Sequence, residues 1–326
     1  MTVTFVEPDP DAGFNYPYYL RVPASEDRRD VGDAIPILVE PTCSGEPTDD
    51  FEHHLKVAQT RIHGGFTSRV ADELGVPLVH PVFPRPASDP VDWTHYVHAL
   101  DAETLTIDDG PLSRIDRQML AMIEDARERL DAAEITTRDR FMLDGFSAAG
   151  TFANRFVALH PDRVLSVSAG GLNGMAILPT ETIPDPAVIP PGLESVWDGT
   201  LPYPLGVADI DDLTGTPFDL VAFREIPQFL YQGGSDDADS LLYPDAWTEP
   251  TLRGAAVFTY GEDVHEERFP TCEAVYDEVG AATVFHTYEG VGHTPKPALA
   301  DVIAFHRGVM AGEDVDSIRL DIEGGN

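Results

Sequence analysis

Three short segments of the chain place a serine, an aspartate and a histidine each directly after a predicted strand. Ser147 lies in GFSAAG (145–150), Asp236 in GGSDDAD (233–239) and His293 in EGVGHT (289–294). A neutral histidine can take the proton of a serine hydroxyl and later return it to a leaving group, while a carboxylate holds the imidazole in one tautomer. The three residue types together indicate nucleophilic catalysis by serine.

The residues around Ser147 suit a sharp turn between a strand and a helix. A serine at such a turn has a strained backbone, at a cost of roughly 1 to 3 kcal/mol, and its hydroxyl projects above the sheet edge. The residues two before and two after it must be small, and Gly145 and Ala149 are small. The start of the following helix also aims amide N–H groups at the serine, which favours developing negative charge.

These three turns resemble those of the α/β-hydrolase family. The segment 145–149 is similar to its nucleophile elbow G-x-S-x-G, with Ala149 in place of the last glycine. Asp236 lies in a turn similar to the G-x-x-D turn, His293 lies in one similar to the G-x-x-H turn, and the order serine, acid, histidine is that of the family. The resemblance covers about residues 16–312 and implies a triad of Ser147, Asp236 and His293.

The acid of this triad has three candidates within one turn. The G-x-x-D frame favours Asp236, followed by Asp239 and then Asp237. For each of them the alternative is a solvated surface carboxylate, which is common in a chain with 57 acidic residues.

The resemblance also implies an oxyanion hole made of two amide N–H groups. One belongs to the residue after the nucleophile, Ala148, and the other comes from the loop after the third strand. That loop is EPTCSG (40–45), in which Pro41 has no N–H, so Cys43 and Ser44 are the candidates. Cys43 is outside any elbow and is expected to be a buried small side chain rather than a second nucleophile.

The implied reaction is hydrolysis of a small-molecule carboxylic ester through a serine acyl-enzyme, with no metal and no organic cofactor. A serine peptidase or an acyltransferase uses the same triad and stays open as an alternative. A protein of this fold that binds a small ligand without turnover is a second alternative. Such proteins usually lack a triad member, so catalysis is favoured.

The periodicity along the chain predicts an α/β fold. Strands are expected at 2–6, 16–22, 35–40, 76–83, 140–143, 164–169, 228–232 and 283–288. Helices are expected at 49–62, at 113–133 with a capping box from Ser113 and Asp116, after Ser147, and at 299–310 before Gly312. This alternation predicts a mostly parallel sheet of about eight strands with helices on both faces. Residues 1–326 are expected to form one domain, with the Pro- and Gly-rich segment 171–226 as a cap inserted into it.

The segment 80–101 holds further polar and aromatic residues. His80, His95 and His98 lack the spacing of a metal site and are expected to pack or to line a pocket. Arg85, Trp93 and Tyr96 (also in this segment) could line the substrate pocket, although a packed Pro-rich loop is the favoured interpretation.

The charge of the chain is strongly one-sided. It has 21 basic and 57 acidic residues and a formal net charge of −36, and its lysines are only Lys56 and Lys296. This composition resembles that of proteins from extreme halophiles. The scarcity of cations argues against nucleic-acid partners and against an anionic membrane surface. The distant pair Cys43 and Cys272 predicts no disulfide, and the N-terminal residues do not read as a signal peptide, so we expect a cytoplasmic protein.

The net charge predicts instability in dilute buffer. Like charges on the surface repel one another, and molar salt shortens the Debye length to about 3 Å. The thermal midpoint is expected to rise from roughly 0.1 M to molar KCl, over which screening changes several-fold. A midpoint that stays flat over this range would contradict the prediction.

Overall fold

The structure is a computed structural model that describes residues 1–24, 34–88, 97–172, 174–185, 188–189, 192–239, 241 and 250–320. Within them, one eight-stranded sheet has the order β1-β2-β4-β3-β5-β6-β7-β8. The strands are β1 Thr2–Val6, β2 Tyr18–Val22, β3 Leu38–Val39, β4 Leu78–Pro81, β5 Phe141–Phe146, β6 Val164–Gly170, β7 Gln228–Gly233 and β8 Thr283–Tyr288. β2 is antiparallel to β1 and β4, and all other pairs are parallel. The predicted fold class and all eight predicted strands are confirmed.

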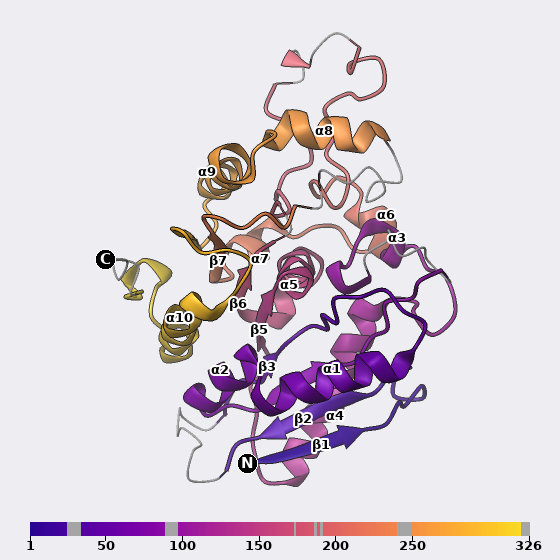
Figure 1. Cartoon of the computed structure of the whole chain (residues 1–326), viewed down its shortest axis with the longest axis vertical. Helices are drawn as coiled ribbons and strands as arrows, with labels where there is room; N and C mark the ends of the chain where they lie inside the picture. The colour runs from indigo at the N-terminus through magenta and orange to yellow at the C-terminus, as the bar shows by residue number, and fades with distance from the viewer. Residues whose placement is uncertain are drawn as a thin grey trace.

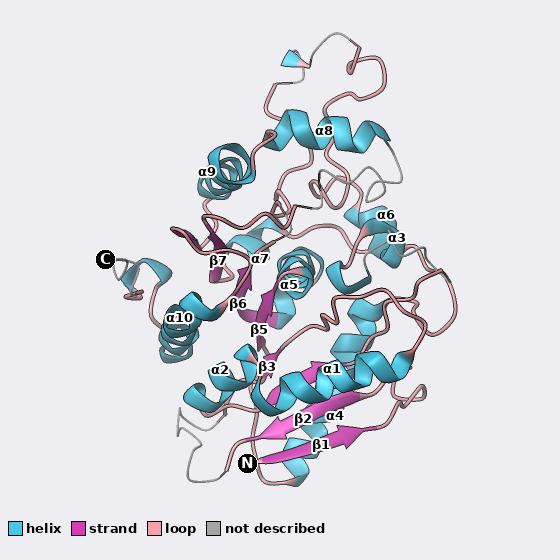
Figure 2. Cartoon of the chain, viewed as in Figure 1, coloured by secondary structure: helices cyan, strands magenta, loops and turns pink. Residues whose placement is uncertain are grey.

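Helices connect the strands and include all four that were expected (Figure 2). They are α1 Phe51–Gly64, α2 Phe66–Leu74, α3 Ala102–Leu105, α4 Ile115–Ala132, α5 Ala148–Leu159, α6 Ile210–Thr214, α7 Leu220–Arg224, α8 Pro250–Tyr260, α9 Phe269–Val279 and α10 Leu299–Ala311. The last of these ends at Gly312, whose φ of 79° is left-handed, as the glycine there predicted.

The central strands are buried on both faces, so neighbouring residues point into two different hydrophobic clusters. Leu38 packs in the cluster that includes residues of α1, α2 and α10, whereas Val39 packs in the one that includes residues of α4 and α5. Met142 and Leu143 divide in the same way on β5. Two helical layers therefore enclose the sheet, as a parallel sheet requires.

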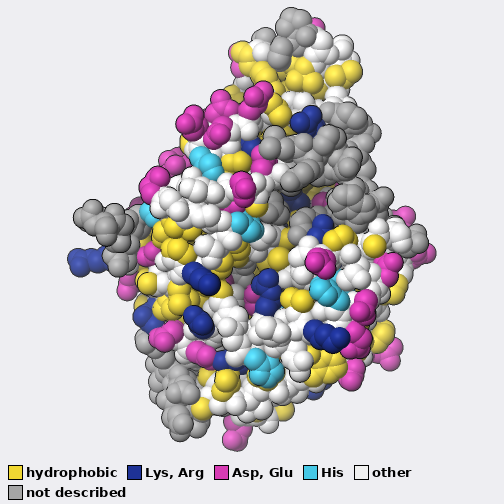
Figure 3. All heavy atoms as spheres, in the orientation of Figure 1, with side chains coloured by type: hydrophobic (Ala, Val, Ile, Leu, Met, Phe, Trp, Pro, Cys, Tyr) yellow, Lys and Arg dark blue, Asp and Glu magenta, His cyan; other side chains and the backbone are white. Residues whose placement is uncertain are grey.

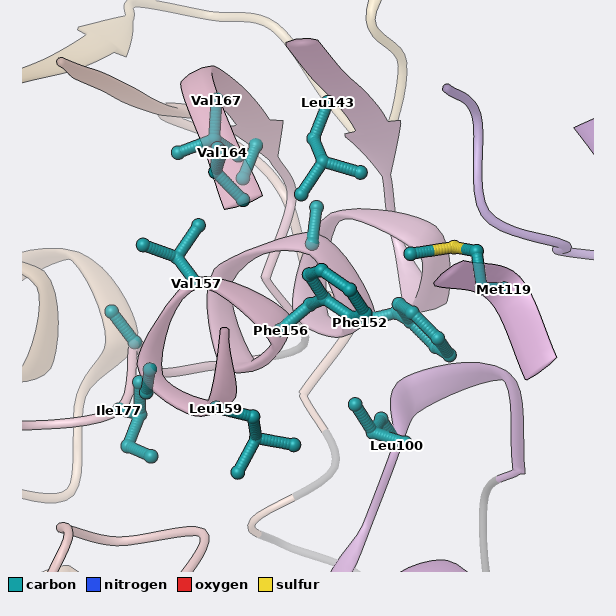
Figure 4. Packing of buried hydrophobic residues seen from close by; sticks show 14 of the residues in the cluster. Leu100, Met119, Leu143, Phe152, Phe156, Val157, Leu159, Val164, Val167 and Ile177 are labelled. Carbon is teal, nitrogen blue, oxygen red and sulfur yellow. The ribbon is translucent and has the colours of Figure 1, made fainter. Parts of the chain in front are cut away.

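Helix α5 is fixed to the sheet by large apolar side chains (Figure 4). The stacked rings of Phe152 and Phe156, 6.0 Å apart, lie close to Leu143 of β5 and Met119 of α4. Burying one such ring contributes about 1.5 to 3 kcal/mol. The packing holds the first residue of α5 in a fixed position at the end of β5.

The start of α4 differs from the expectation of a capping box. The N-cap is Arg114, with a φ of 50°, and no side chain caps the helix. Asp116 is fully buried and accepts hydrogen bonds from Arg114 at 2.9 and 2.6 Å and contacts His160 at 2.9 Å. The carboxylate that would have completed the box with Ser113 pairs with Arg114 and His160 instead.

The long connection between β6 and β7 contains little regular structure. In the described part of 171–226, α6 and α7 are short helices of 5 residues each. This connection lies with α8 and α9 toward the upper end of the molecule in Figure 1, away from β1 and β2.

Two smaller points concern the cysteines and the helices. Cys43 and Cys272 are both free, as their separation in sequence predicted, and both are buried. None of the helices in the described residues is both long enough and apolar enough to span a membrane.

Candidate active site

Ser147 lies at the turn between β5 and α5 in a conformation that few non-glycine residues adopt. Its φ is 62° and its ψ is −130°. Its amide donates to the Gly170 carbonyl at 2.9 Å, and its own carbonyl accepts from the Thr151 amide at 2.9 Å. Hydrogen bonds to β6 and to α5 thus hold the strained residue in place, as expected of a nucleophile elbow.

Glycines on both sides of Ser147 allow the strand and the helix to approach. A Cβ on Gly145 would lie 2.3 Å from the Ala149 carbonyl oxygen, which explains the small residue predicted there. A Cβ on Gly150 would lie 2.5 Å from the Gly170 carbonyl oxygen on β6. Ala149, the second position expected to be small, is fully buried, but the close approach to β6 falls at Gly150.

Asp236 and His293 lie together at the ends of β7 and β8. The Nδ1 of His293 is 2.8 Å from Asp236 Oδ2 and 2.9 Å from Oδ1. Burial raises the pKa of Asp236, but the hydrogen bonds with His293 and the Ala238 amide outweigh it and leave the pKa below its ordinary value. The carboxylate is therefore ionised at neutral pH and keeps the proton of the histidine on Nδ1, with Nε2 free to act as a base.

The loops that carry these two residues are tied to each other. The Ser235 amide donates to the Val291 carbonyl and the Gly234 amide to the Tyr288 carbonyl, both at 2.8 Å. A Cβ on Gly233 would lie 2.3 Å from the Val291 carbonyl oxygen. The close contact of the two loops sets the position of the carboxylate relative to the imidazole.

The other two aspartates of this turn are placed differently. Asp239 forms a buried, two-pronged ion pair with Arg268. Asp237 is exposed. Of the three candidates that the sequence left open, Asp236 is the one whose carboxylate contacts His293.

Ser147 and His293 line the same cavity, which has a volume of about 310 Å³. Its other lining residues come from the loop after β3, from α1 and α2, and from the turns after β5 and β8: Glu40, Cys43, Arg61, Phe66, Thr67, Phe146 and Pro295. The ring of Phe146 packs 4.7 Å from that of His293. Glu40 belongs to the loop 40–45 that was expected to supply the second oxyanion donor, whereas nothing in the predicted helix 49–62 indicates that Arg61 borders the nucleophile.

The two groups predicted for the oxyanion hole meet beside this cavity. Ala148 is the first residue of α5 and packs with Cys43 in one small buried cluster. The Ser44 amide donates to Nδ1 of His98 at 3.4 Å. Burial lowers the pKa of His98 to about 3, so its ring stays neutral and keeps accepting this bond. The Cys43 amide is therefore the better candidate for the second donor.

The remaining polar residues of 80–101 support the loop after β3. His80 Nδ1 lies 3.2 Å from Glu40, and Arg85 donates to the Gly45 carbonyl at 2.6 Å. His80 and His98 are buried, as the packing interpretation expected, whereas His95, Trp93 and Tyr96 lie outside the described residues. Nowhere in the described ranges do three His, Cys, Asp or Glu side chains gather as a metal site.

A second group of serine, histidine and aspartate side chains is buried inside the protein, where β5 and β6 face α10. Ser168 Oγ is 2.7 Å from Asp144 and 2.8 Å from His306 Nε2, and Ser166 Oγ is 2.8 Å from His306 Nδ1. The serine hydroxyl thus lies between the acid and the histidine, which is not the order of a charge-stabilised triad. All four side chains are at most 1% exposed, so no substrate reaches them.

Asp144 is expected to destabilise the protein at neutral pH. Burial raises its pKa to about 7, against the opposing hydrogen bonds from Ser168 and Thr67. The unfolded chain loses this proton near pH 4, so the free energy of unfolding falls between roughly pH 4 and 7 and then stays low. Asp144→Asn should raise the free energy of unfolding at pH 8 by on the order of 1 to 3 kcal/mol.

Denaturant titrations in molar KCl at pH 5 and pH 8 measure this effect, with exposed Asp237→Asn as the control. The gain from Asp144→Asn should shrink toward pH 5, because wild-type Asp144 is then protonated in the folded state. An equal change at both pH values would show that the raised pKa is not its cause.

No family model and no curated protein matches this chain. Several solved structures are similar to it over most of its length. A poly(aspartic acid) hydrolase-1 from Sphingomonas sp. KT-1 is 19% identical, with a TM-score of 0.49 over 94% of this chain and 95% of that one. An S-formylglutathione hydrolase from Agrobacterium tumefaciens is 15% identical, with a TM-score of 0.49 over 96% and 94%. LpqC, a poly(3-hydroxybutyrate) depolymerase from Bordetella parapertussis, is 16% identical, with a TM-score of 0.48 over 95% and 87%. At these scores and identities, none of the three says which reaction this chain performs.

Proposed function

We propose that this protein is a serine hydrolase that cleaves small carboxylic esters, with Ser147 as nucleophile, His293 as base and Asp236 as the acid that orients it. One observation carries the proposal: Ser147 and His293 line the same cavity. Ser147 has a φ of 62°, and Nδ1 of His293 is 2.8 Å from the buried carboxylate of Asp236. This pairing matches the roles that nucleophilic catalysis requires.

The reaction follows from the groups present. Ser147 Oγ attacks the ester carbonyl while His293 Nε2 takes its proton, and the oxyanion that forms accepts hydrogen bonds from the amides of Ala148 and Cys43. The bond to the alcohol then breaks, and His293 returns the proton to the leaving alcohol. Water, deprotonated by the same histidine, then attacks the acyl carbon. The bond to Ser147 Oγ breaks, His293 returns the proton to Ser147, and the acid is released.

The alternatives use the same site. A peptidase or an acyltransferase would differ in the leaving group or in the acceptor of the acyl group. A protein that only binds a ligand has no need for a strained serine beside an ordered histidine, so the strain at Ser147 favours catalysis. We also propose that residues 1–326 form a single domain and that the segment 171–226 is a cap inserted into it.

A fluorophosphonate probe tests the proposal directly. In molar KCl, Ser147 Oγ should form a bond to phosphorus with loss of fluoride, and mass spectrometry of the digested protein should find the adduct on the peptide that contains Ser147. The probe should label neither Ser166 nor Ser168, which are buried. Folded protein that is not labelled, or is labelled elsewhere, would contradict the proposal.

A further inference from the structure

The cavity beside Ser147 contains one strong positive charge. Among its lining residues in the described part of the chain, Arg61 of α1 is the one arginine or lysine. The side chain of Arg61 is 33% exposed, whereas Glu40, its carboxylate partner, is 4% exposed. Both side chains line the cavity with Ser147, and that of Arg61 is the more accessible of the two.

Glu40 holds this guanidinium without using up its donors. Arg61 Nη1 is 3.0 Å from Glu40 Oε1, and the other oxygen, Oε2, faces His80 Nδ1 at 3.2 Å. Burial disfavours the charge on Arg61, but Glu40 keeps the pKa of Arg61 above its ordinary value. Cys43 is a second hydrogen-bond partner of Arg61. A guanidinium has five N–H donors in a rigid plane, so donors stay available for a ligand after the bonds to Glu40 and Cys43.

The positive charge of Arg61 at the cavity contrasts with the strongly negative charge of the rest of the protein. The chain carries a net charge of −36, and the face in Figure 3 shows many Asp and Glu side chains toward its edges with several Lys and Arg side chains nearer its middle. A surface with this net charge repels anions unless salt screens it. A fixed guanidinium next to the nucleophile provides a local site where an anionic group is attracted.

We propose that Arg61 binds a carboxylate of the substrate, so that the preferred substrates are small esters that bear a carboxylate group. The planar guanidinium matches a carboxylate with two parallel hydrogen bonds. The cavity of about 310 Å³ is at the small end of ligand sites and suits a short ester. This inference rests on the proposed ester hydrolysis at Ser147.

The test compares esters that differ only in charge. Ethyl half-esters of succinic, glutaric and adipic acid are assayed against the same esters with a carboxamide in place of the carboxylate. A second arm uses O-acetylglycolate against O-acetylglycolamide, which places the charge on the alcohol side. In molar KCl, wild type should prefer the anionic member of at least one pair by about 10- to 100-fold in kcat/KM, as expected for a hydrogen bond to a charged group.

Substitutions of Arg61 assign the preference to one side chain. Arg61→Gln should remove most of the preference, and Arg61→Lys should retain part of it, because lysine keeps the charge but not the planar fork. The matched control is Arg69→Gln on α2, whose side chain is exposed and does not line the cavity. It should leave the preference intact.

Arg61→Gln leaves buried Glu40 without one partner and can impair folding, so Glu40→Gln/Arg61→Gln provides a neutral version of the same pair. A wild type labelled by fluorophosphonate that cleaves both members of every pair equally would overturn the inference and leave the proposed function standing. A preference for the anionic esters that survives in both Arg61→Gln and the double variant would likewise overturn the inference and leave the proposed function standing. A wild type that is neither labelled nor active would overturn both.

Discussion

Ser147→Ala should lower kcat for a short ester such as 4-nitrophenyl butyrate by about 10⁵- to 10⁶-fold, as expected when a triad nucleophile is removed. Alanine has no hydroxyl to attack the carbonyl, so the acyl-enzyme cannot form. What remains is the contribution of the oxyanion hole and of substrate binding. Initial rates in molar KCl, with active protein quantified by its thermal unfolding transition, measure the loss.

Ser168→Ala is the matched control for this experiment. Its hydroxyl bridges Asp144 and His306 inside the protein, so its loss should cost about 1 to 3 kcal/mol of stability, with rates per folded molecule within a few-fold of wild type. The buried position of Ser168 makes it a structural residue in our interpretation. Activity that survives Ser147→Ala and disappears in Ser168→Ala would assign the nucleophile to the internal group instead.

The position of the proposed nucleophile could be predicted because it depends on local sequence. Gly145 lies two positions before Ser147, and the requirement for a small side chain at 145 follows from the turn itself. The same applies to β8 and the glycines before His293. Where strand, turn and helix signals coincide within a few residues, the sequence carries the information that positions the side chain.

The residues that surround the nucleophile could not be predicted in this way. Arg61 and Glu40 are 21 residues apart in sequence, and their contact depends on how α1 packs on β2 and β4. The preference for Asp236 over Asp239 likewise depends on Arg268, which lies 29 residues further along the chain and pairs with Asp239. Such contacts are decided by tertiary packing and leave no periodic signal.

The exact ends of strands and helices were also predicted less well than the elements themselves. The third strand was expected at 35–40 but pairs as a strand only at Leu38–Val39, since Ile35 forms an isolated bridge with Thr137. The expected capping box at the start of α4 was wrong because Arg114 and His160 take the carboxylate of Asp116. Pro36, which has no N–H, limits pairing at the first place, and at the second the distant His160 takes part in holding the carboxylate.

Asp236→Asn should lower kcat/KM for a short ester by about 10⁴-fold, as found when the acid of a serine triad becomes an amide. The amide can donate to Nδ1 of His293 and so favour the tautomer whose Nε2 carries the proton and cannot accept one from Ser147. The imidazolium that forms during acyl transfer also loses a carboxylate 2.8 Å away. The fold should tolerate the change, because the amide keeps the size of the carboxylate.

Asp237→Asn and Asp239→Asn complete this comparison within one turn. The first removes an exposed charge and should leave kcat/KM within about two-fold of wild type, since surface changes have small effects. The second breaks the buried pair with Arg268, so it should cost about 3 to 5 kcal/mol of stability while folded molecules stay active. A fall of several orders of magnitude in Asp239→Asn at full folding, with near-normal rates in Asp236→Asn, would move the role of the acid to Asp239. Each of the three substitutions removes one negative charge from the same loop. Differences in kcat/KM among the variants therefore reflect contact with His293 rather than the net charge of the protein.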